Sequence, residues 1–201
     1  MSDNPANIAL FGTSADPPHQ GHAAVLAWLG SQFDHVAVWV SDNPFKQHQT
    51  ALGDRIKMLE LLIGELQSPG VALHPELSYS RTVFTIERAR DIWPAAQFTL
   101  VVGADLVRQL PKWYRAEEIF AAVNVLVVPR PGYSLNEEDL MELKRHTTVN
   151  VAEIPQQHDV SSTQIRQEDQ TFKLPSAVEA YIHQHNLYSC PEDSREKLSM
   201  R

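Results

Sequence analysis

Two histidines three residues apart close the segment Gly12-Thr-Ser-Ala-Asp-Pro-Pro-His-Gln-Gly-His22, which also carries two hydroxyl side chains. A short apolar run precedes this segment and an amphipathic stretch follows it, so His19 and His22 fall where a helix is expected to begin. The free amides and the dipole of a helix N-terminus attract anions, and both imidazoles can donate hydrogen bonds to phosphate oxygens. Gly12 and Gly21 permit close approach of a ligand or of another backbone segment. The segment therefore predicts a phosphate-binding loop.

Two other interpretations of this loop stay open from the residues alone. It lacks both the G-x-x-x-x-G-K-[ST] pattern of P-loops and the G-x-G-x-x-G pattern of dehydrogenases. It could be a plain Gly- and Pro-rich connection with two exposed histidines. It could also offer two imidazoles to a metal ion, but neither an H-E-x-x-H pattern nor a cysteine partner supports that.

A second candidate for phosphate binding is Val160-Ser-Ser-Thr-Gln-Ile-Arg166, near the end of the chain. Hydroxyl groups and free amides at a helix start bind terminal phosphates. Arg166 comes three residues after Thr163, so both side chains lie on one helix face. Taken alone, a Ser-Ser-Thr run is also a common helix cap.

The rest of the sequence alternates short apolar runs with longer amphipathic ones. This alternation predicts a Rossmann-like, doubly wound α/β fold, with a mostly parallel sheet and helices on both faces. In such a sheet, ligands bind beyond the C-terminal ends of the strands, where both candidate segments lie. The predicted strands are Ile8–Phe11, His35–Val40, Val71–His74, Phe98–Val102, Val123–Val128 and Val149–Glu153. The predicted helices are Gly21–Ser31, Leu52–Gln67, Thr82–Trp93, one opened by a capping box at Ser134–Glu137, and one opened by a capping box at Ser176–Glu179 and ended by Asn186.

Length and composition limit the classes of protein to which the chain can belong. Its 201 residues predict one domain over 1–188, followed by a polar tail at 189–201. The net charge of −8 argues against unselective binding to nucleic acid or to an anionic membrane. The single cysteine excludes an intrachain disulfide, and the N-terminus has no signal-peptide pattern, so we expect a cytoplasmic protein.

The two phosphate-binding candidates carry a family resemblance. His19-Gln-Gly-His22 resembles the H-x-G-H signature of a nucleotidylyltransferase superfamily, and Val160–Arg166 is similar to its I-S-S-T-x-I-R motif. Upstream of the histidines the fit is looser, because Thr13 stands where the family has a second glycine and Ser14 where it has threonine.

The middle of the chain indicates a subfamily. Gly103-Ala-Asp105 followed by Leu110-Pro-Lys-Trp113 resembles the G-A-D…L-x-x-W segment of nicotinate-nucleotide adenylyltransferases. Ser80-Arg-Thr-Val-Phe-Thr85 is similar to their S-Y-T-x-x-T segment, with Arg81 in place of tyrosine. Val128-Pro-Arg130 and Leu174–Tyr188 also fit, so the resemblance covers about residues 7–188.

The resemblance implies a set of site residues. The catalytic groups would be His19, His22, Lys46 and Arg166. The ATP-binding residues would be Gly12, Thr13, Ser14, Gly21, Arg130, Ser162 and Thr163. The residues that bind a pyridine mononucleotide would be Ser80, Thr82, Thr85, Gly103, Asp105 and Trp113. No residue is expected to hold a resident metal, and Mg²⁺ would be carried by ATP.

Several of these residues have simpler interpretations. Trp113 could be a core aromatic and Asp105 a helix cap. Lys46 and Arg130 could be solvated charges, and so could Arg55, which opens a predicted helix.

The implied reaction transfers the adenylyl group of ATP to nicotinate mononucleotide, giving deamido-NAD and pyrophosphate. The acceptor phosphate is already an anionic nucleophile near neutral pH, so the protein must mainly bring two anions together and stabilise developing charge. The alternatives are transfer to nicotinamide mononucleotide or to both mononucleotides, and a catalytically silent nucleotide-binding homologue. The expected partners are the two substrates, without nucleic acid or membrane, and a homo-oligomer is left open.

Overall fold

The computed structural model describes residues 5–41, 50–130, 132–155, 160–168 and 173–188. Within these ranges, six parallel strands form one sheet in the order β3-β2-β1-β4-β5-β6. Leu10 of β1 pairs with Ala37 of β2 on one side and with Leu100 of β4 on the other. The strand order reverses between β1 and β4, which is the point where doubly wound sheets bind ligands. The strands are β1 Asn7–Thr13, β2 His35–Val40, β3 Val71–Leu73, β4 Gln97–Gly103, β5 Asn124–Val128 and β6 Val149–Val151.

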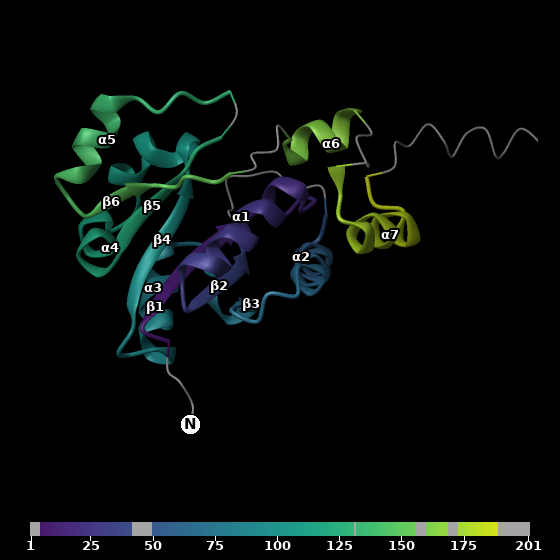
Figure 1. The fold of residues 1–201 in the computed structure, drawn as a ribbon, viewed down its shortest axis with the longest axis horizontal. Coiled ribbons are helices and arrows are strands. Elements are labelled where there is room, and N and C mark those ends of the chain that lie inside the picture. Colours follow the sequence, from purple (N-terminus) through teal and green to yellow (C-terminus); the bar gives the residue numbers. More distant parts are fainter. Residues whose placement is uncertain (1–4, 42–49, 131, 156–159, 169–172, 189–201) are drawn as a thin grey trace, which may run out of the picture.

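Helices cover both faces of the sheet. Side chains that alternate along each strand are therefore buried on opposite faces. Ile8 and Leu10 pack in one apolar cluster, whereas Ala9 between them packs in the other. In Figure 1, α6 and α7 lie on the same side of the molecule as α2, away from α4 and α5. The α-helices are α1 Gln20–Gln32, α2 Leu52–Leu66, α3 Thr82–Ile92, α4 Ala116–Ala122, α5 Glu137–Lys144, α6 Ser162–Glu168 and α7 Ser176–His185, with 3-10 helices η1 Pro75–Leu77 and η2 Ala104–Lys112.

The predicted fold class is confirmed, and each predicted strand overlaps an observed one. Both predicted capping boxes are wrong. Helix α5 begins after Asn136, whose side chain accepts from the Glu138 amide, and Ser134 is not its cap. Ser176 is already inside α7, where its hydroxyl donates to Glu65 of α2, 2.8 Å away. The Glu65 carboxylate also accepts from the Ala177 amide, so a side chain of another helix pairs this free N–H in place of a local cap. Asn186 does end α7 in the left-handed conformation, as predicted.

No helix within the described ranges combines the length and apolarity needed to cross a lipid bilayer. The predicted polar tail, 189–201, lies outside the described residues.

Candidate active site

A cavity of about 1080 Å³ opens where β1, β4 and β5 end and the loops that follow them begin. Its lining includes every predicted site residue that the structure describes, from both phosphate-binding segments and from the middle of the chain. Lys46 lies outside the described residues. The cavity is lined by His19, His22, Arg166, Gly12, Thr13, Ser14, Gly21, Arg130, Ser162, Thr163, Ser80, Thr82, Thr85, Gly103, Asp105 and Trp113, among others.

The two histidines of the loop after β1 cap helix α1. His19 is the N-cap residue, and its Nδ1 accepts from the Gly21 amide at 3.1 Å. The Nδ1 atom of His22, three residues on, accepts in return from the His19 amide at 3.2 Å. The ring centroids are 4.0 Å apart. A Cβ atom at Gly21 would lie 3.0 Å from the His19 ring, a tight contact that glycine avoids beneath this reciprocal cap.

This cap fixes which ring nitrogen carries the proton. An imidazole nitrogen that accepts from a backbone N–H cannot itself be protonated, so both Nδ1 atoms are lone-pair acceptors. Each neutral ring therefore carries its proton on Nε2. The Nε2 atom of His22 lies 2.9 Å from Thr13 Oγ1, to which it donates. Two imidazole donors are thereby held in one tautomer by the backbone beneath them.

His22 is neutral in this environment. Burial, and to a lesser extent the positive charge of Arg130, lowers its pKa from 6.5 to about 4. A neutral imidazole is still the hydrogen-bond donor that the sequence analysis expects at this position. An anion beside the ring favours its charged form and offsets the positive charge of Arg130, so binding of phosphate would raise the pKa of His22.

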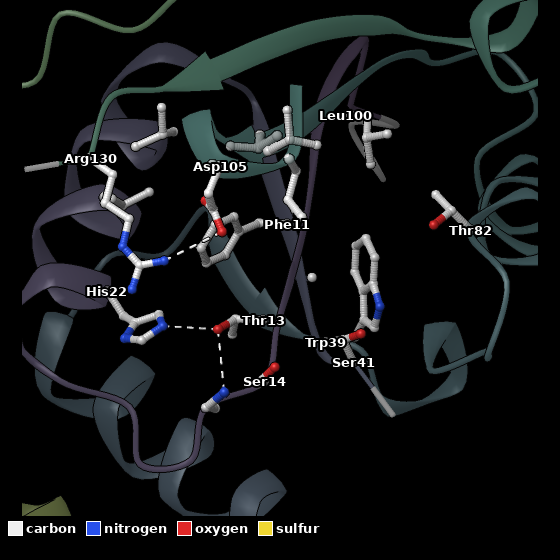
Figure 2. Close-up of a pocket in the computed structure, with 18 of the residues that line it drawn as sticks. Phe11, Thr13, Ser14, His22, Trp39, Ser41, Thr82, Leu100, Asp105 and Arg130 are labelled. Atoms are coloured by element: carbon white, nitrogen blue, oxygen red, sulfur yellow. Dashed lines mark hydrogen bonds and ion pairs between the residues drawn. The ribbon is translucent and has the colours of Figure 1, made fainter. Parts of the chain in front are cut away.

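Thr13 stands where related motifs have glycine, yet it fits as an ordinary strand residue at the end of β1. Its hydroxyl oxygen accepts from both the His22 ring and the Ala15 amide, at 2.9 and 3.3 Å. Figure 2 shows these two contacts on one side of the cavity, with the Arg130 side chain above the His22 ring. The departure from the family pattern therefore supplies a partner for the second histidine.

Arg130 and Asp105 form an ion pair at the ends of neighbouring strands β5 and β4. Arg130 Nη1 and Asp105 Oδ2 are 3.5 Å apart, and both side chains reach solvent through the cavity (Figure 2). The Arg130 guanidinium also lies 5.6 Å from the Tyr133 ring centroid. Asp105 Oδ1 would be 2.5 Å from a Cβ atom at Gly103, so that glycine leaves room for the carboxylate. Both charged groups are therefore placed at the strand ends, where predicted.

Two side chains of helix α6 donate hydrogen bonds to backbone carbonyls of the loop after β1. Ser162 donates to the Pro17 carbonyl at 2.8 Å, and Arg166 donates to the Asp16 carbonyl through Nη1. Arg166 Nη2 also donates to Thr163 Oγ1 at 3.3 Å. Because the Ser162 hydroxyl already donates its one proton, it offers no proton to a phosphate in this arrangement. Two residues predicted to act on ATP thus also join the two phosphate-binding segments.

Asp16 is a site residue that the sequence hypothesis did not include. Its side chain is 3% exposed, and Oδ1 accepts from Thr50 at 2.6 Å and from Tyr188 at 2.7 Å. Tyr188 is the last described residue, 172 positions further along the chain. The Asp-Pro pair in the loop motif could have indicated Asp16 from the sequence. Its partners Thr50 and Tyr188 could not be predicted, because only the tertiary fold brings them to it.

Arg55 corrects one expectation directly. Its side chain is 1% exposed, so it is not the surface charge that one interpretation allowed. Its Nη1 donates to the Ser14 and Ser41 carbonyls, both at 3.2 Å, and so joins the loop after β1 to the end of β2. Nothing in the spacing around Arg55 distinguishes this buried role from an exposed one.

The other end of the cavity is aromatic. Trp113 is half-buried, lines the cavity and packs against the core cluster, and its role in binding the mononucleotide stays a prediction. Tyr79 and Tyr114 also line the cavity and are 42% and 51% exposed. Thr85 lies in the wall but is buried, and its hydroxyl donates to the Leu77 carbonyl at 3.0 Å. Its side chain therefore shapes this end of the cavity.

Trp39 is a second residue that the sequence hypothesis missed. The indole is 5% exposed and forms part of the cavity wall between Thr82 and the loop after β1 (Figure 2). A Cβ atom at Gly12 would lie 2.6 Å from this ring, which explains why glycine is needed there. The signal in the sequence was an aromatic residue next to the end of a predicted strand.

The donor groups of the cavity do not fit a resident metal site. Within the described ranges, His, Cys, Asp and Glu side chains do not gather in threes around a position that could hold a metal ion. Asp105 is paired with Arg130, and the Asp16 carboxylate accepts from two hydroxyls. Mg²⁺ and Ca²⁺ prefer clusters of oxygen ligands, which these residues do not provide.

Comparisons with known proteins extend this description. Residues 10–168 match the family model described as cytidylyltransferase-like. The chain is 41% identical over 196 residues to a probable nicotinate-nucleotide adenylyltransferase of Synechocystis sp., covering 90% of this chain and 98% of the relative. It is 33% identical to a protein of the same description from Bacillus pumilus, covering 90% and 97%.

A solved structure supports the same fold. The Plasmodium falciparum nicotinic acid mononucleotide adenylyltransferase in complex with NaAD superposes with a TM-score of 0.79 at 19% identity, covering 91% of this chain and 97% of the other. At this identity the likeness establishes the doubly wound fold and its extent. Together with the sequence relatives and the family model, it shows that the chain belongs to the nicotinate-nucleotide adenylyltransferases.

Proposed function

We propose that this protein transfers the adenylyl group of ATP to nicotinate mononucleotide, releasing pyrophosphate and deamido-NAD. The main observation behind the proposal is one cavity with two different ends. One end is rich in groups that donate hydrogen bonds to phosphate, and the other is aromatic. The cavity volume of about 1080 Å³ lies slightly above the roughly 300–1,000 Å³ of ordinary small-ligand sites, which favours a site for more than one substrate. The family membership supports the same reaction.

The phosphate end supplies the groups that this reaction needs. A phosphate oxygen of the mononucleotide attacks the α-phosphorus of ATP, and the bond to the leaving pyrophosphate breaks. When ATP binds, the Nε2–H group of His22 can pass its hydrogen bond from Thr13 to an α-phosphate oxygen, while Nδ1 keeps its backbone contact. His19 lies against it in the same tautomer. Rings whose Nδ1 atoms are already held by the backbone need little reorientation when charge moves toward the leaving group.

The charged side chains divide the remaining work. Arg166, three residues after Thr163 on α6, is placed to bind the phosphates that leave as pyrophosphate. Arg130, beside His22 and near Tyr133, supports binding of the adenosine part. Asp105 offers a carboxylate to ribose hydroxyls and Trp113 offers a ring to the pyridine. No side chain is required as a strong base, because the nucleophile is already ionised near neutral pH.

Several finer features belong to the same proposal. Mg²⁺ enters on the triphosphate, since the described residues form no carboxylate cluster to hold it separately. Residues 1–188 act as a single domain that takes ATP and the mononucleotide as its partners. The single cysteine in 201 residues supports a cytoplasmic location, where disulfides rarely form.

A direct assay tests this function. Purified protein is incubated with ATP, Mg²⁺ and either nicotinate or nicotinamide mononucleotide, and both the dinucleotide and pyrophosphate are quantified. We expect both products with the nicotinate substrate, in equal amounts. ATP binding without turnover of either mononucleotide would instead identify a catalytically silent nucleotide-binding homologue, and turnover with the amide alone would reverse the acceptor.

A further inference from the structure

The aromatic end of the cavity contains a guanidinium group. Arg81 lines the cavity, and its Cζ atom lies 5.5 Å from the centroid of the Tyr114 ring. Tyr114 follows Trp113, and both line the same cavity. The structure therefore places a planar cation next to the aromatic side chains on which a pyridine ring would stack.

The backbone around Arg81 favours the same sign of ligand charge. Arg81 is the N-cap residue of α3, and the first turn of that helix contains no acidic residue. A helix N-terminus carries a partial positive charge and attracts anions. Neither the helix end nor the arginine alone identifies a ligand, but the two lie at a cavity whose proposed substrate carries a carboxylate on an aromatic ring.

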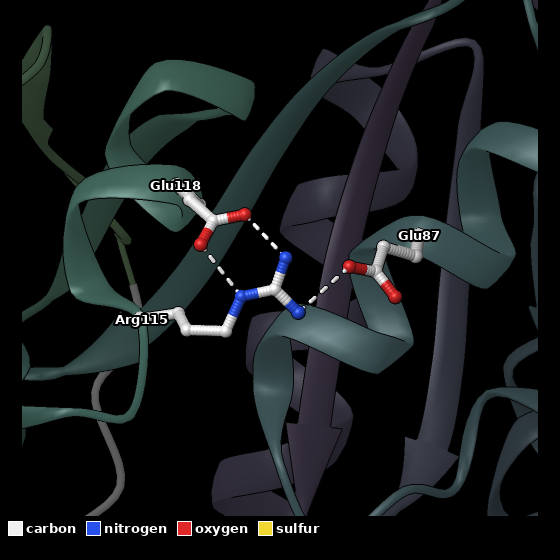
Figure 3. Close-up of polar contacts among 3 residues, drawn as sticks. All are labelled: Glu87, Arg115 and Glu118. Atoms are coloured by element: carbon white, nitrogen blue, oxygen red, sulfur yellow. Dashed lines mark hydrogen bonds and ion pairs between the residues drawn. The ribbon is translucent and has the colours of Figure 1, made fainter.

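The wall that carries Tyr114 is fixed to the wall that carries Arg81. Figure 3 shows Arg115, the residue after Tyr114, reaching from the start of α4 to Glu87 of α3 and to Glu118 of α4. Arg115 Nη1 is 3.1 Å from Glu87 Oε1, and its Nε donates to Glu118 at 2.6 Å. The pKa of Glu118 is lowered by this hydrogen bond. These contacts link the segment that carries Tyr114 to helix α3, whose N-cap residue is Arg81.

We infer that Arg81 determines the preference for the acid by pairing its guanidinium with the carboxylate of the nicotinate ring. A guanidinium presents two parallel N–H donors to a carboxylate, which has two equivalent acceptor oxygens. A carboxamide offers one oxygen and turns an NH₂ group toward the same donors, so it is bound less well. This inference rests on the proposed function and goes beyond it by naming the residue that selects between acid and amide.

Lys112 is the competing cation at this end of the cavity. It is exposed, lines the cavity and ends η2 directly before Trp113. An ammonium group is a flexible point charge without the paired donors of a guanidinium. The K112Q variant is therefore a matched control, because it removes a positive charge from the same part of the cavity and leaves Arg81 in place.

The experiment compares kcat/KM and Kd for the nicotinate and nicotinamide mononucleotides in the wild type and in R81Q, R81K and K112Q. We expect R81Q to lower kcat/KM for the acid by about 10- to 100-fold, the loss of a hydrogen-bonded charge pair. The value for the amide should change by less than about threefold and the KM for ATP should stay fixed. R81K should retain part of the preference, and K112Q should retain most of it.

Three results would overturn the inference. These are an R81Q variant that keeps the wild-type preference, equal losses for acid and amide, and a preference that disappears in K112Q instead. A wild type that makes no dinucleotide breaks the proposed function, and calorimetric Kd values then still decide whether Arg81 discriminates acid from amide. If R81Q does not fold, the ratio of the two Kd values in R81K decides the question.

Discussion

Two pairs of histidines border the sheet at different places, and their hydrogen-bond partners differ. In the pair His19 and His22, at the C-terminal ends of the central strands, each Nδ1 accepts from a backbone amide, so both rings are neutral Nε2 donors. His35 begins β2, and its Nε2 lies 2.9 Å from Nε2 of His74, which follows the edge strand β3. Neither member of this second pair lines the cavity.

The second pair is held by acceptors, where the first is held by donors. His74 Nδ1 lies 2.9 Å from a Glu76 carboxylate oxygen, and His35 donates to the Gly70 carbonyl. Burial and the neighbouring His74 lower the pKa of His35. Identical residue types thus take different partners: the first pair accepts from backbone amides beside the cavity, whereas the second lies against a carboxylate and a backbone carbonyl.

Replacing His22 with alanine tests the catalytic side of this comparison and has the largest expected effect. Loss of a donor aimed at the transition-state charge should lower kcat by about 10²- to 10³-fold, on the order of 2–4 kcal/mol. The KM for ATP should change much less. Steady-state kinetics measure both, and a folded variant with nearly normal kcat would contradict the role given to His22.

Because of His22 in the first pair, acid should lower the free energy of unfolding of the protein. The pKa of His22 is about 4 in the folded protein, against an ordinary value of 6.5 for a solvated histidine, so between these pH values the unfolded chain binds the extra proton. Stability is therefore lost as the pH falls from 6.5 toward 4, by about 3 kcal/mol from this group alone. Urea unfolding at several pH values should give a flatter acid slope in H22A than in the wild type.

The second pair should contribute to stability without contributing to turnover. H74A removes the partner of both His35 and Glu76, and should lower the free energy of unfolding by about 1–3 kcal/mol at neutral pH. Its kcat should remain within about twofold of the wild type, because neither ring faces the cavity. Denaturant unfolding and the product assay together check this. A large loss of kcat in a stable H74A variant would contradict the claim that the second pair does not contribute to turnover.

The smallest expected effect concerns Thr13. T13V keeps the side-chain shape but removes the oxygen that accepts from His22 Nε2, so kcat should fall by about three- to tenfold. T13S restores the oxygen and should recover most of the activity. An unchanged kcat in T13V would show that the backbone contact at Nδ1 is sufficient to orient the His22 ring.

Local pattern predicted much of this structure, and long-range contacts account for what it missed. The strands and the loop with His19 and His22 follow from hydrophobic periodicity and a short motif. The tautomer of each ring could not be predicted, because it depends on which backbone amides face it. Ser176 carries the local signature of a helix cap, but a carboxylate from α2 takes its hydroxyl instead.

Buried charge was the least predictable feature of the site. Arg55 resembles any arginine in the first turn of an amphipathic helix, and only the fold brings the Ser14 and Ser41 carbonyls to it. Arg81 was recognisable as a departure from the family pattern, whereas its neighbour Tyr114 was not singled out. The predicted role of Lys46 stays a prediction, since that residue lies outside the described ranges.

The hydrogen bond from Tyr188 to Asp16 has a consequence for the order in which the chain matures during synthesis. The six strands are complete once Val151 has been made, whereas the loop after β1 receives its last described support from a residue 37 positions later. Contacts between residues so distant in sequence form late, because closing long loops is entropically costly. A nascent chain that ends before Tyr188 therefore contains every residue of the six strands but lacks the hydroxyl that holds Asp16 of the phosphate-binding loop.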